Sequence, residues 1–229
     1  MMLGTIPDRL CVMGTSVPNC HFSSFRCHLL VVARAVGRPL ANVRGMALLY
    51  DATLTPTKLE VLEGWVPTQP WGADAADGLE LVGRFRFDDP DGEVGIEAFV
   101  VRTAGGTVLH VPLTYRGAPL EGATLVSTME HSVLGHRWVY DALTDPVYGA
   151  VLADVIATGA REAMQYLHQD DGPPTEYPSS IRAWGVPSLD DDPTVEVLRV
   201  VDLDAVTPAD GVLLAEWEGL AAPVVLATA

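Results

Sequence analysis

Apolar and polar residues alternate along three consecutive segments in the middle of the chain, and this period of two is typical of strands with one buried face. The predicted strands are Leu79–Phe87, Glu93–Arg102 and Thr107–Tyr115. Turn residues separate them, with Asp, Pro and Gly over 88–92 and two glycines at 105 and 106. Because such short links favour hairpins, we expect these strands to pair as an antiparallel meander.

The first strand of this meander carries its large apolar side chains at alternate positions. Strict alternation would place four of them on one face: Leu79, Leu81, Phe85 and Phe87. Two further strands are predicted over Leu125–His131 and His136–Tyr140, joined at Gly135. An earlier strand is expected over residues 46–50.

Two helices are predicted, one before and one after these strands in the sequence. Thr57 and Glu60 have the spacing of a capping box, and Pro56 stands where a helix entry tolerates proline. Asp145, as N-cap, and Pro146 begin a second helix that runs to about residue 158. Its apolar stripe is Tyr148, Leu152, Val155 and Ile156. Helices beside an antiparallel meander predict an α+β fold.

Breaks rich in Pro and Asp indicate how the chain is divided. We expect a main domain over residues 46–168, a linker over 169–180 and a small β-rich C-terminal extension over 181–229. Residues 160–168 fit either a continued helix or a strand. Strands are predicted in the extension at 181–186, 194–202, 211–217 and 223–226, as a second β unit or as strands added to the first sheet.

Residues 1–45 differ from the rest of the chain in charge and in pattern. They hold five Arg and one acidic residue, with no sustained helical or strand period. A signal peptide is disfavoured because Arg34 interrupts a short apolar patch. Two interpretations remain: a disordered arm, or a gene prediction that starts too early, with Met46 as the natural start. We favour the second, and both predict that this segment is poorly ordered. The three cysteines (Cys11, Cys20 and Cys27) fit neither a disulfide framework nor a zinc site.

The net charge of −16 restricts the classes of partner. Nucleic-acid binding needs clustered Lys and Arg, yet Lys58 is the only lysine in the sequence. Acidity also disfavours anionic membranes, and no apolar run reaches the roughly 18 residues that span a bilayer. We therefore expect a cytoplasmic protein that binds neither nucleic acid nor membrane.

The sequence contains none of the common catalytic motifs. It has no GxxxxGK[ST] or GxGxxG loop, no GxSxG elbow and no kinase-like HRD or DFG motif. Glu130 and His131 are neighbours in a strand and would point to opposite faces, which disfavours a local triad with Ser127 or Ser132. His131 and His136 have the spacing of neither a strand nor a helical metal site. We predict no catalytic residue, no cofactor and no metal.

Reactive and aromatic side chains are nevertheless dense over His110–Asp141, where we interpret the aromatic residues chiefly as packing residues. The residues predicted to contact a protein partner or a sugar are Trp71, Tyr115, Arg116, Glu130, His131 and Arg137. For the charged and imidazole side chains among them, we expect a buried hydrogen-bonding network or a docking face in preference to catalysis.

Five separated motifs carry a family resemblance. They are TLTPTKLE at 53–60, WVPTQPW at 65–71, FDDPDGEVGIE at 87–97, VPLTYRGAPL at 111–120 and MEHSVLGHRWVYD at 129–141. In this order they resemble the N-terminal cap domain of actinobacterial maltokinases and related aminosugar kinases, from about Met46 to Ile156. The resemblance implies a cystatin-like curved antiparallel sheet with packed helices. It transfers no catalytic residue, since in those kinases the catalytic part follows the cap.

The resemblance implies a role in carbohydrate metabolism. We expect a stand-alone, non-catalytic accessory or regulatory module linked to trehalose, maltose or glycogen metabolism or to aminosugar phosphorylation. Its expected partner is a sugar kinase or another glucan-pathway protein. Two alternatives stay open: a carbohydrate-binding or glucan-modifying enzyme, and a fragment of a sugar kinase that lacks its catalytic lobes.

Overall fold

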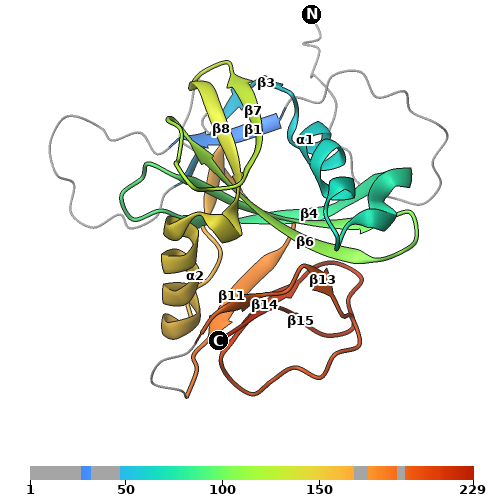
Figure 1. Ribbon diagram of the computed structural model, residues 1–229. Helices are drawn as coiled ribbons and strands as arrows, with labels where there is room; N and C mark the ends of the chain where they lie inside the picture. The colour runs from blue at the N-terminus through green and yellow to red at the C-terminus, as the bar shows by residue number, and fades with distance from the viewer. Residues whose placement is uncertain (1–26, 32–46, 168–174, 190–193) are drawn as a thin grey trace, which may run out of the picture.

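The computed structural model describes residues 27–31, 47–167, 175–189 and 194–229 (Figure 1). The predicted N-terminal extension therefore lies outside the described residues, except for strand β1 (Cys27–Val31). Within the described ranges, no helix is both long enough and apolar enough to cross a membrane.

A curled, seven-stranded antiparallel sheet, here called the central sheet, organises the fold. Its strands are β3 (Leu54–Thr55), β4 (Leu79–Asp88), β5 (Gly95–Thr103), β6 (Val108–Arg116), β7 (Leu125–His131), β8 (Gly135–Asp141) and β13 (Val200–Val201). The order is β3-β7-β8-β6-β5-β4, and β13 pairs with β6 beyond the end of β8. This curved sheet with few helices confirms the predicted α+β class.

A β-bulge in β4 corrects one detail of the predicted sheet. The register shifts between Leu81 and Gly83, because one extra residue is inserted there. The insertion reverses the alternation of side chains along the rest of the strand. Phe85 and Phe87 therefore pack on one side of the sheet, and Leu79 packs on the other. The prediction that Leu79, Leu81, Phe85 and Phe87 share one face is wrong.

The two predicted helices cover opposite faces of the central sheet (Figure 1). They are α1 (Lys58–Trp65) and α2 (Pro146–Thr158), accompanied by the short 3-10 helices η1 (Val66–Thr68), η2 (Ala73–Asp77) and η3 (Ala142–Thr144). Helix α1 packs into a core with Phe99 and Val101 of β5, whereas α2 shares a core with Val100. Neighbouring strand residues point to opposite faces, so each helix closes its own core.

Both helices begin where the sequence predicts. The Thr57 hydroxyl accepts a hydrogen bond from the Glu60 backbone N–H, and the Glu60 carboxylate accepts one from the Thr57 backbone, so the capping box is formed. The Asp145 carboxylate caps α2 by accepting from the Val147 N–H, with Pro146 at the first turn. The predicted apolar stripe of α2 is buried: Tyr148, Leu152, Val155 and Ile156.

The C-terminal region forms a second sheet on the α2 side of the central sheet. Its strands, in spatial order, are β11 (Arg182–Val186), β14 (Val212–Glu216), β15 (Val224–Thr228) and β12 (Glu196–Val197). The segment predicted as one strand over 194–202 is split, because β12 pairs with β15 whereas β13 pairs with β6. The region is thus both a second β unit and an added strand of the first sheet.

Helix α2 and strand β11 lie so close together that no side chain fits at Gly185. A Cβ atom there would lie 2.0 Å from the Val155 carbonyl oxygen. Ala183 and Leu213 of the second sheet share one apolar core with Phe85 of the central sheet. This core contains residues that precede the predicted linker at 169–180 and residues that follow it. The division into domains stays a prediction.

A third sheet has the strand order β1-β2-β9-β10. Its strands besides β1 are β2 (Ala47–Ala52), β9 (Gln165–Leu167) and β10 (Thr175–Tyr177). Strand β2 confirms the strand expected near the start of the main domain. Strand β9 decides between the two alternatives for 160–168 in favour of a strand, and it pairs in parallel with β2.

Candidate functional site

The six residues predicted to contact a partner or a sugar differ widely in exposure. Tyr115 and His131 are buried, Trp71, Arg116 and Arg137 are partly buried, and Glu130 is exposed. The charged and imidazole side chains among them each bond to a neighbour within the fold. The surface that they offer to a partner is therefore smaller than the sequence predicts.

Arg116 fastens the start of α2 to strand β6. Its Nε and Nη2 atoms donate to the two carboxylate oxygens of Asp145, each at 2.7 Å. The Thr114 hydroxyl donates to the same carboxylate at 2.8 Å. Burial alone would raise the pKa of Asp145, but the bonds from Arg116, Thr114 and the Val147 N–H together lower it. The guanidinium of Arg116 thus serves the fold.

His131 and Arg137 stabilise the turn between β7 and β8. His131 Nδ1 accepts from the backbone N–H groups of Val133 and Leu134 at 3.0 and 3.1 Å. Arg137 Nη2 donates to the Leu134 carbonyl at 2.8 Å. Burial, followed by the charge of Arg137, lowers the pKa of His131 to about 4. The ring is therefore neutral at pH 7, as an accepting Nδ1 requires.

Tyr115 lies beside a buried cluster of charges. Lys58 Nζ is 5.5 Å from the centroid of the Tyr115 ring and forms an ion pair with Glu97. Arg84 Nε and Arg86 Nη1 approach the Glu97 carboxylate at 3.5 and 3.8 Å. Burial alone would raise the pKa of Glu97, but these cations lower it to about 2. The cluster was not predicted, although two arginines alternating with phenylalanines in one strand were a visible signal.

The exposed candidate surface is one face of the β7–β8 hairpin. Glu130 lies opposite His136, and Thr128 lies opposite Trp138, so these four side chains share a face. Glu130 Oε1 is 2.6 Å from His136 Nδ1, and the two side chains are 67% and 42% exposed. The His136 ring meets Trp138 edge-on, with centroids 4.5 Å apart. We call Thr128, Glu130, His136 and Trp138 the hairpin face.

Trp71 lies at the junction between the central sheet and the C-terminal region. Its ring packs edge-on against Trp65, with centroids 5.6 Å apart. The Arg199 guanidinium lies 4.8 Å from the Trp71 centroid and forms an ion pair with Asp141 at the end of β8. Neither Arg199 nor Asp141 was predicted as a contact residue. The available signal was an isolated arginine in an otherwise acidic region.

His110, at the start of the stretch densest in reactive side chains, is fully buried on β6. Its ring stacks on Phe85 with centroids 6.1 Å apart. Burial, followed by the charge of Arg199, lowers the pKa of His110 to about 3, although the backbone of Leu198 and Leu226 favours the protonated ring. His110 is therefore a neutral packing residue at pH 7.

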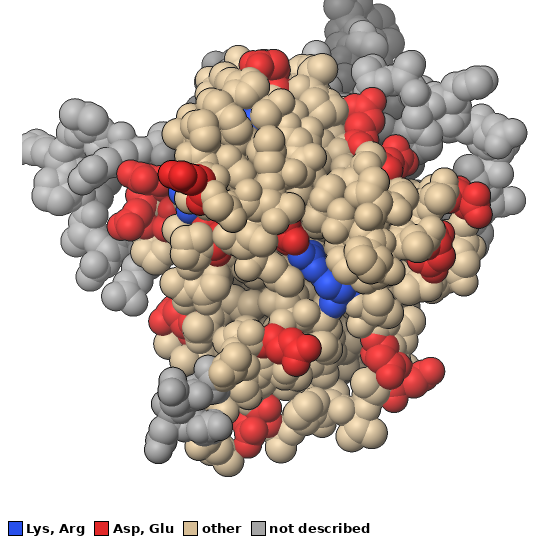
Figure 2. All heavy atoms as spheres, viewed as in Figure 1, with Lys and Arg blue, Asp and Glu red and all other residues tan. Residues whose placement is uncertain are grey.

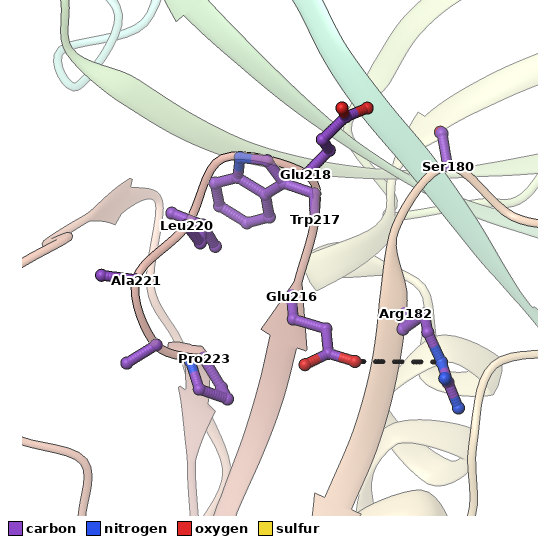
Figure 3. A pocket seen from close by; sticks show the side chains of 9 residues that line it. Ser180, Arg182, Glu216, Trp217, Glu218, Leu220, Ala221 and Pro223 are labelled. Atoms are coloured by element: carbon purple, nitrogen blue, oxygen red, sulfur yellow. Dashed lines mark ion pairs between the residues drawn. The ribbon is translucent and has the colours of Figure 1, made fainter.

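An open pocket of about 380 Å³ lies beside the loop between β14 and β15 (Figure 3). The Trp217 indole, Leu220 and Pro223 supply apolar surface. Arg182 Nε and Glu216 Oε1 lie 4.0 Å apart in the same pocket. An indole beside paired charged groups combines an apolar platform with groups that can hydrogen-bond a polar ligand. None of these residues was among the predicted contacts.

The surface charge follows the composition of the chain. Figure 2 shows acidic side chains spread over the visible face, with Lys and Arg exposed in few places. Such a face is unsuited to a phosphate backbone. Among the residues that the structure describes, no group of three or more His, Cys, Asp or Glu is placed to hold a metal ion.

Comparison with known families identifies the central part of the chain. Residues 65–145 match the family model of the maltokinase N-terminal cap domain. The matched segment contains the hairpin face, the Arg116–Asp145 pair and both Trp65 and Trp71. It confirms the resemblance over the four motifs that it contains, whereas the motif at 53–60 precedes the matched residues. No curated protein sequence matches the chain.

Proposed function

We propose that the protein is a non-catalytic accessory module, active in the cytoplasm, that docks onto a sugar kinase or another protein of trehalose, maltose or glycogen metabolism or of aminosugar phosphorylation. The match of residues 65–145 to the maltokinase N-terminal cap domain carries this proposal. The bonding of Arg116, His131 and Arg137 within the fold supports it, because these side chains hold a scaffold together.

Docking through the hairpin face is the form of this function that the exposed residues favour. Tryptophan is enriched among the residues that anchor protein interfaces, and Trp138 is half-buried on this face. The exposed Glu130–His136 pair next to it supplies directional polar groups. A complementary partner would offer an apolar notch for the indole and a basic or hydroxyl-bearing rim for the carboxylate.

Calorimetric titration of the full chain against a sugar kinase from the same genome tests this proposal. We expect a saturable complex, a changed rate of phosphorylation of maltose or glucosamine, and no sugar phosphate from the chain alone. Trp138→Ala should weaken the complex about tenfold or more, as loss of an interface anchor does. Trp217→Ala, in the loop between β14 and β15, is the matched control. Sugar phosphorylation by the chain alone, or wild-type affinity of Trp138→Ala, would contradict the proposal.

Sugar binding is the second candidate function, and the pocket of Figure 3 favours it. An indole can stack on the C–H face of a pyranose while Arg182 and Glu216 bond its hydroxyls. Titration of the full chain with maltose, trehalose and glucosamine should then release heat that Trp217→Ala abolishes and Trp138→Ala retains. Absence of a heat signal at millimolar sugar would exclude this function.

A further inference from the structure

The indoles of Trp65 and Trp71 are held in place by their own segment of the chain. The Thr68 hydroxyl donates to the Trp65 carbonyl at 2.6 Å in the turn that follows α1. The chain then folds back so tightly that a Cβ atom at Gly72 would lie 2.3 Å from the Val66 carbonyl oxygen. The two indoles therefore meet edge-on in a segment whose backbone is held by local contacts.

The Arg199 side chain lies against these two indoles and against Asp141 at the end of β8. We call Trp65, Trp71 and Asp141 together the notch. The guanidinium carbon of Arg199 lies 4.8 Å from the Trp71 centroid and 5.8 Å from that of Trp65. Its Nη2 atom donates to Asp141, and the Arg199 and Asp141 side chains are 11% and 14% exposed. Aromatic faces and carboxylates are the two kinds of group that recognise a guanidinium best. The notch offers both.

Arg199 uses this notch incompletely. Its Nη1 atom is buried, yet it has no hydrogen-bond partner among the described residues. A buried donor without a partner costs free energy.

The backbone around Arg199 occupies an edge of strand β6. The His110 N–H donates to the Arg199 carbonyl at 2.9 Å, and Val200 and Val201 pair with Leu109 and Val108. Strand β8 pairs with β6 only over its other end, up to Leu113. Strand β13 has two residues, and the Val200 side chain is 49% exposed. So short a strand covers this edge of β6 with few backbone hydrogen bonds, and an extended peptide can pair with the edge of a sheet in the same way.

The recognition groups and their occupant come from different parts of the chain. Trp65, Trp71 and Asp141 lie within the segment that matches the cap domain, whereas Arg199 lies beyond it. We propose that Trp65, Trp71 and Asp141 form an arginine-recognition site that Arg199 fills from the same chain, and that an extended partner segment carrying an arginine binds there by replacing Arg199–Val201. The exchange by a partner rests on the proposed docking function, whereas the site itself does not.

Chemical rescue of the full-length Arg199→Ala variant tests the site. Methylguanidinium at millimolar concentration should raise the melting temperature of this variant by about 3 °C or more, as binding to the folded state does, and leave the wild type within about 1 °C. Equimolar sodium chloride is the control for ionic strength. Asp141 also caps η3 by accepting from the Leu143 N–H. Rescue should vanish in Arg199→Ala/Asp141→Asn, where Asn keeps a side-chain oxygen for this cap. Equal shifts in all variants, or none, would overturn the proposal.

Peptide binding to the same variant tests exchange. A fluorescent peptide with the sequence of residues 196–203, EVLRVVDL, should bind full-length Arg199→Ala at least about tenfold more tightly than the wild type. Its Arg-to-Ala counterpart should bind at least about tenfold more weakly. Equal affinity of the two peptides would overturn the proposal.

Both experiments can be carried out even if Arg199→Ala does not fold, and neither depends on a kinase. Should Arg199→Ala not fold, Arg199→Lys serves, because lysine keeps the charge without the planar fork; the Arg peptide should again bind it more tightly than the wild type. Neither arm contains a kinase, so failure of the docking function would leave a positive result for the site intact.

Discussion

Lys58 of α1 and Glu97 of β5 form an ion pair whose side chains are only 3% and 1% exposed. Arg84 and Arg86 approach the same carboxylate, so one anion lies among three cations. Charges removed from water this completely are tolerated only while their partners remain. The pair attaches α1 to the central sheet through charge, in addition to the apolar contacts of Val61 and Leu62.

We expect Glu97→Gln to lower the free energy of unfolding by about 3 kcal/mol, because it leaves buried cations without their carboxylate. Urea unfolding followed by circular dichroism measures the loss. Lys58→Met/Glu97→Leu, which removes both charges of the pair, should recover part of it. A loss below about 1 kcal/mol in Glu97→Gln would show that the carboxylate is not the group that stabilises the cluster.

The pH dependence of stability should reveal Glu97 separately. Its pKa is lowered from 4.5 to about 2, so the stability that it contributes is fully present above pH 4.5 and is lost as the pH falls toward 2. The wild type should therefore lose more stability than Glu97→Gln over this window. Parallel curves for the two proteins would contradict the assignment.

Protonation of His110 should lower the stability of the protein in a higher pH range than protonation of Glu97 does. The folded pKa of His110 is about 3 and lies below the ordinary value of 6.5, so the contribution of the neutral ring is complete above pH 6.5 and is lost as the pH falls toward 3. Between pH 7 and 5 the loss from this residue should be about 2 kcal/mol, because only the unfolded chain takes up the proton. His110→Leu should flatten the curve, leaving the slope due to His131. An unchanged slope would contradict the prediction.

The close approach of α2 and β11 predicts opposite effects at two glycines. Gly185→Ala should destabilise the protein by about 2 kcal/mol or more, because its Cβ would overlap the Val155 carbonyl and push the helix away. At Gly149, on the exposed side of the same helix, an added Cβ would have no atom of another part of the protein within 4 Å, so Gly149→Ala should stabilise the protein by about 0.5–1 kcal/mol. Thermal unfolding distinguishes the two. Similar effects at both sites would contradict the packing.

Features set by neighbouring residues were predictable from the sequence. The capping box of Thr57 and Glu60, the Asp145 cap and the turns of the meander each depend on a few consecutive side chains. The hairpin that carries Glu130 and His136 was predicted for the same reason. The antiparallel pairing of β4 with β5, of β5 with β6 and of β7 with β8 follows from the same short links, because a strand joined by a tight turn can only fold back on its neighbour.

Features set by contacts between distant segments were not predictable. The bulge between Leu81 and Gly83 leaves the apolar pattern of β4 looking regular, although it reverses the faces. Lys58 of α1 has the polarity of a surface residue, and its burial depends on Glu97 of strand β5. The Arg199 side chain reaches Trp71 and Asp141 because the strand before it pairs with β15 and the strand after it pairs with β6. In each case the deciding partner is far away in sequence.

The division of that segment determines how the two sheets can move. Strands β12 and β13 are separated by Leu198 and Arg199 alone, yet one belongs to the second sheet and the other to the central sheet. Sliding one sheet along the other by a single residue would break both registers at once. This short connection therefore helps to hold the two sheets in one register, together with the apolar core that they share. A partner that displaced Arg199–Val201 would remove the pairing of β13 with β6 and leave the shared core alone to hold the two sheets together.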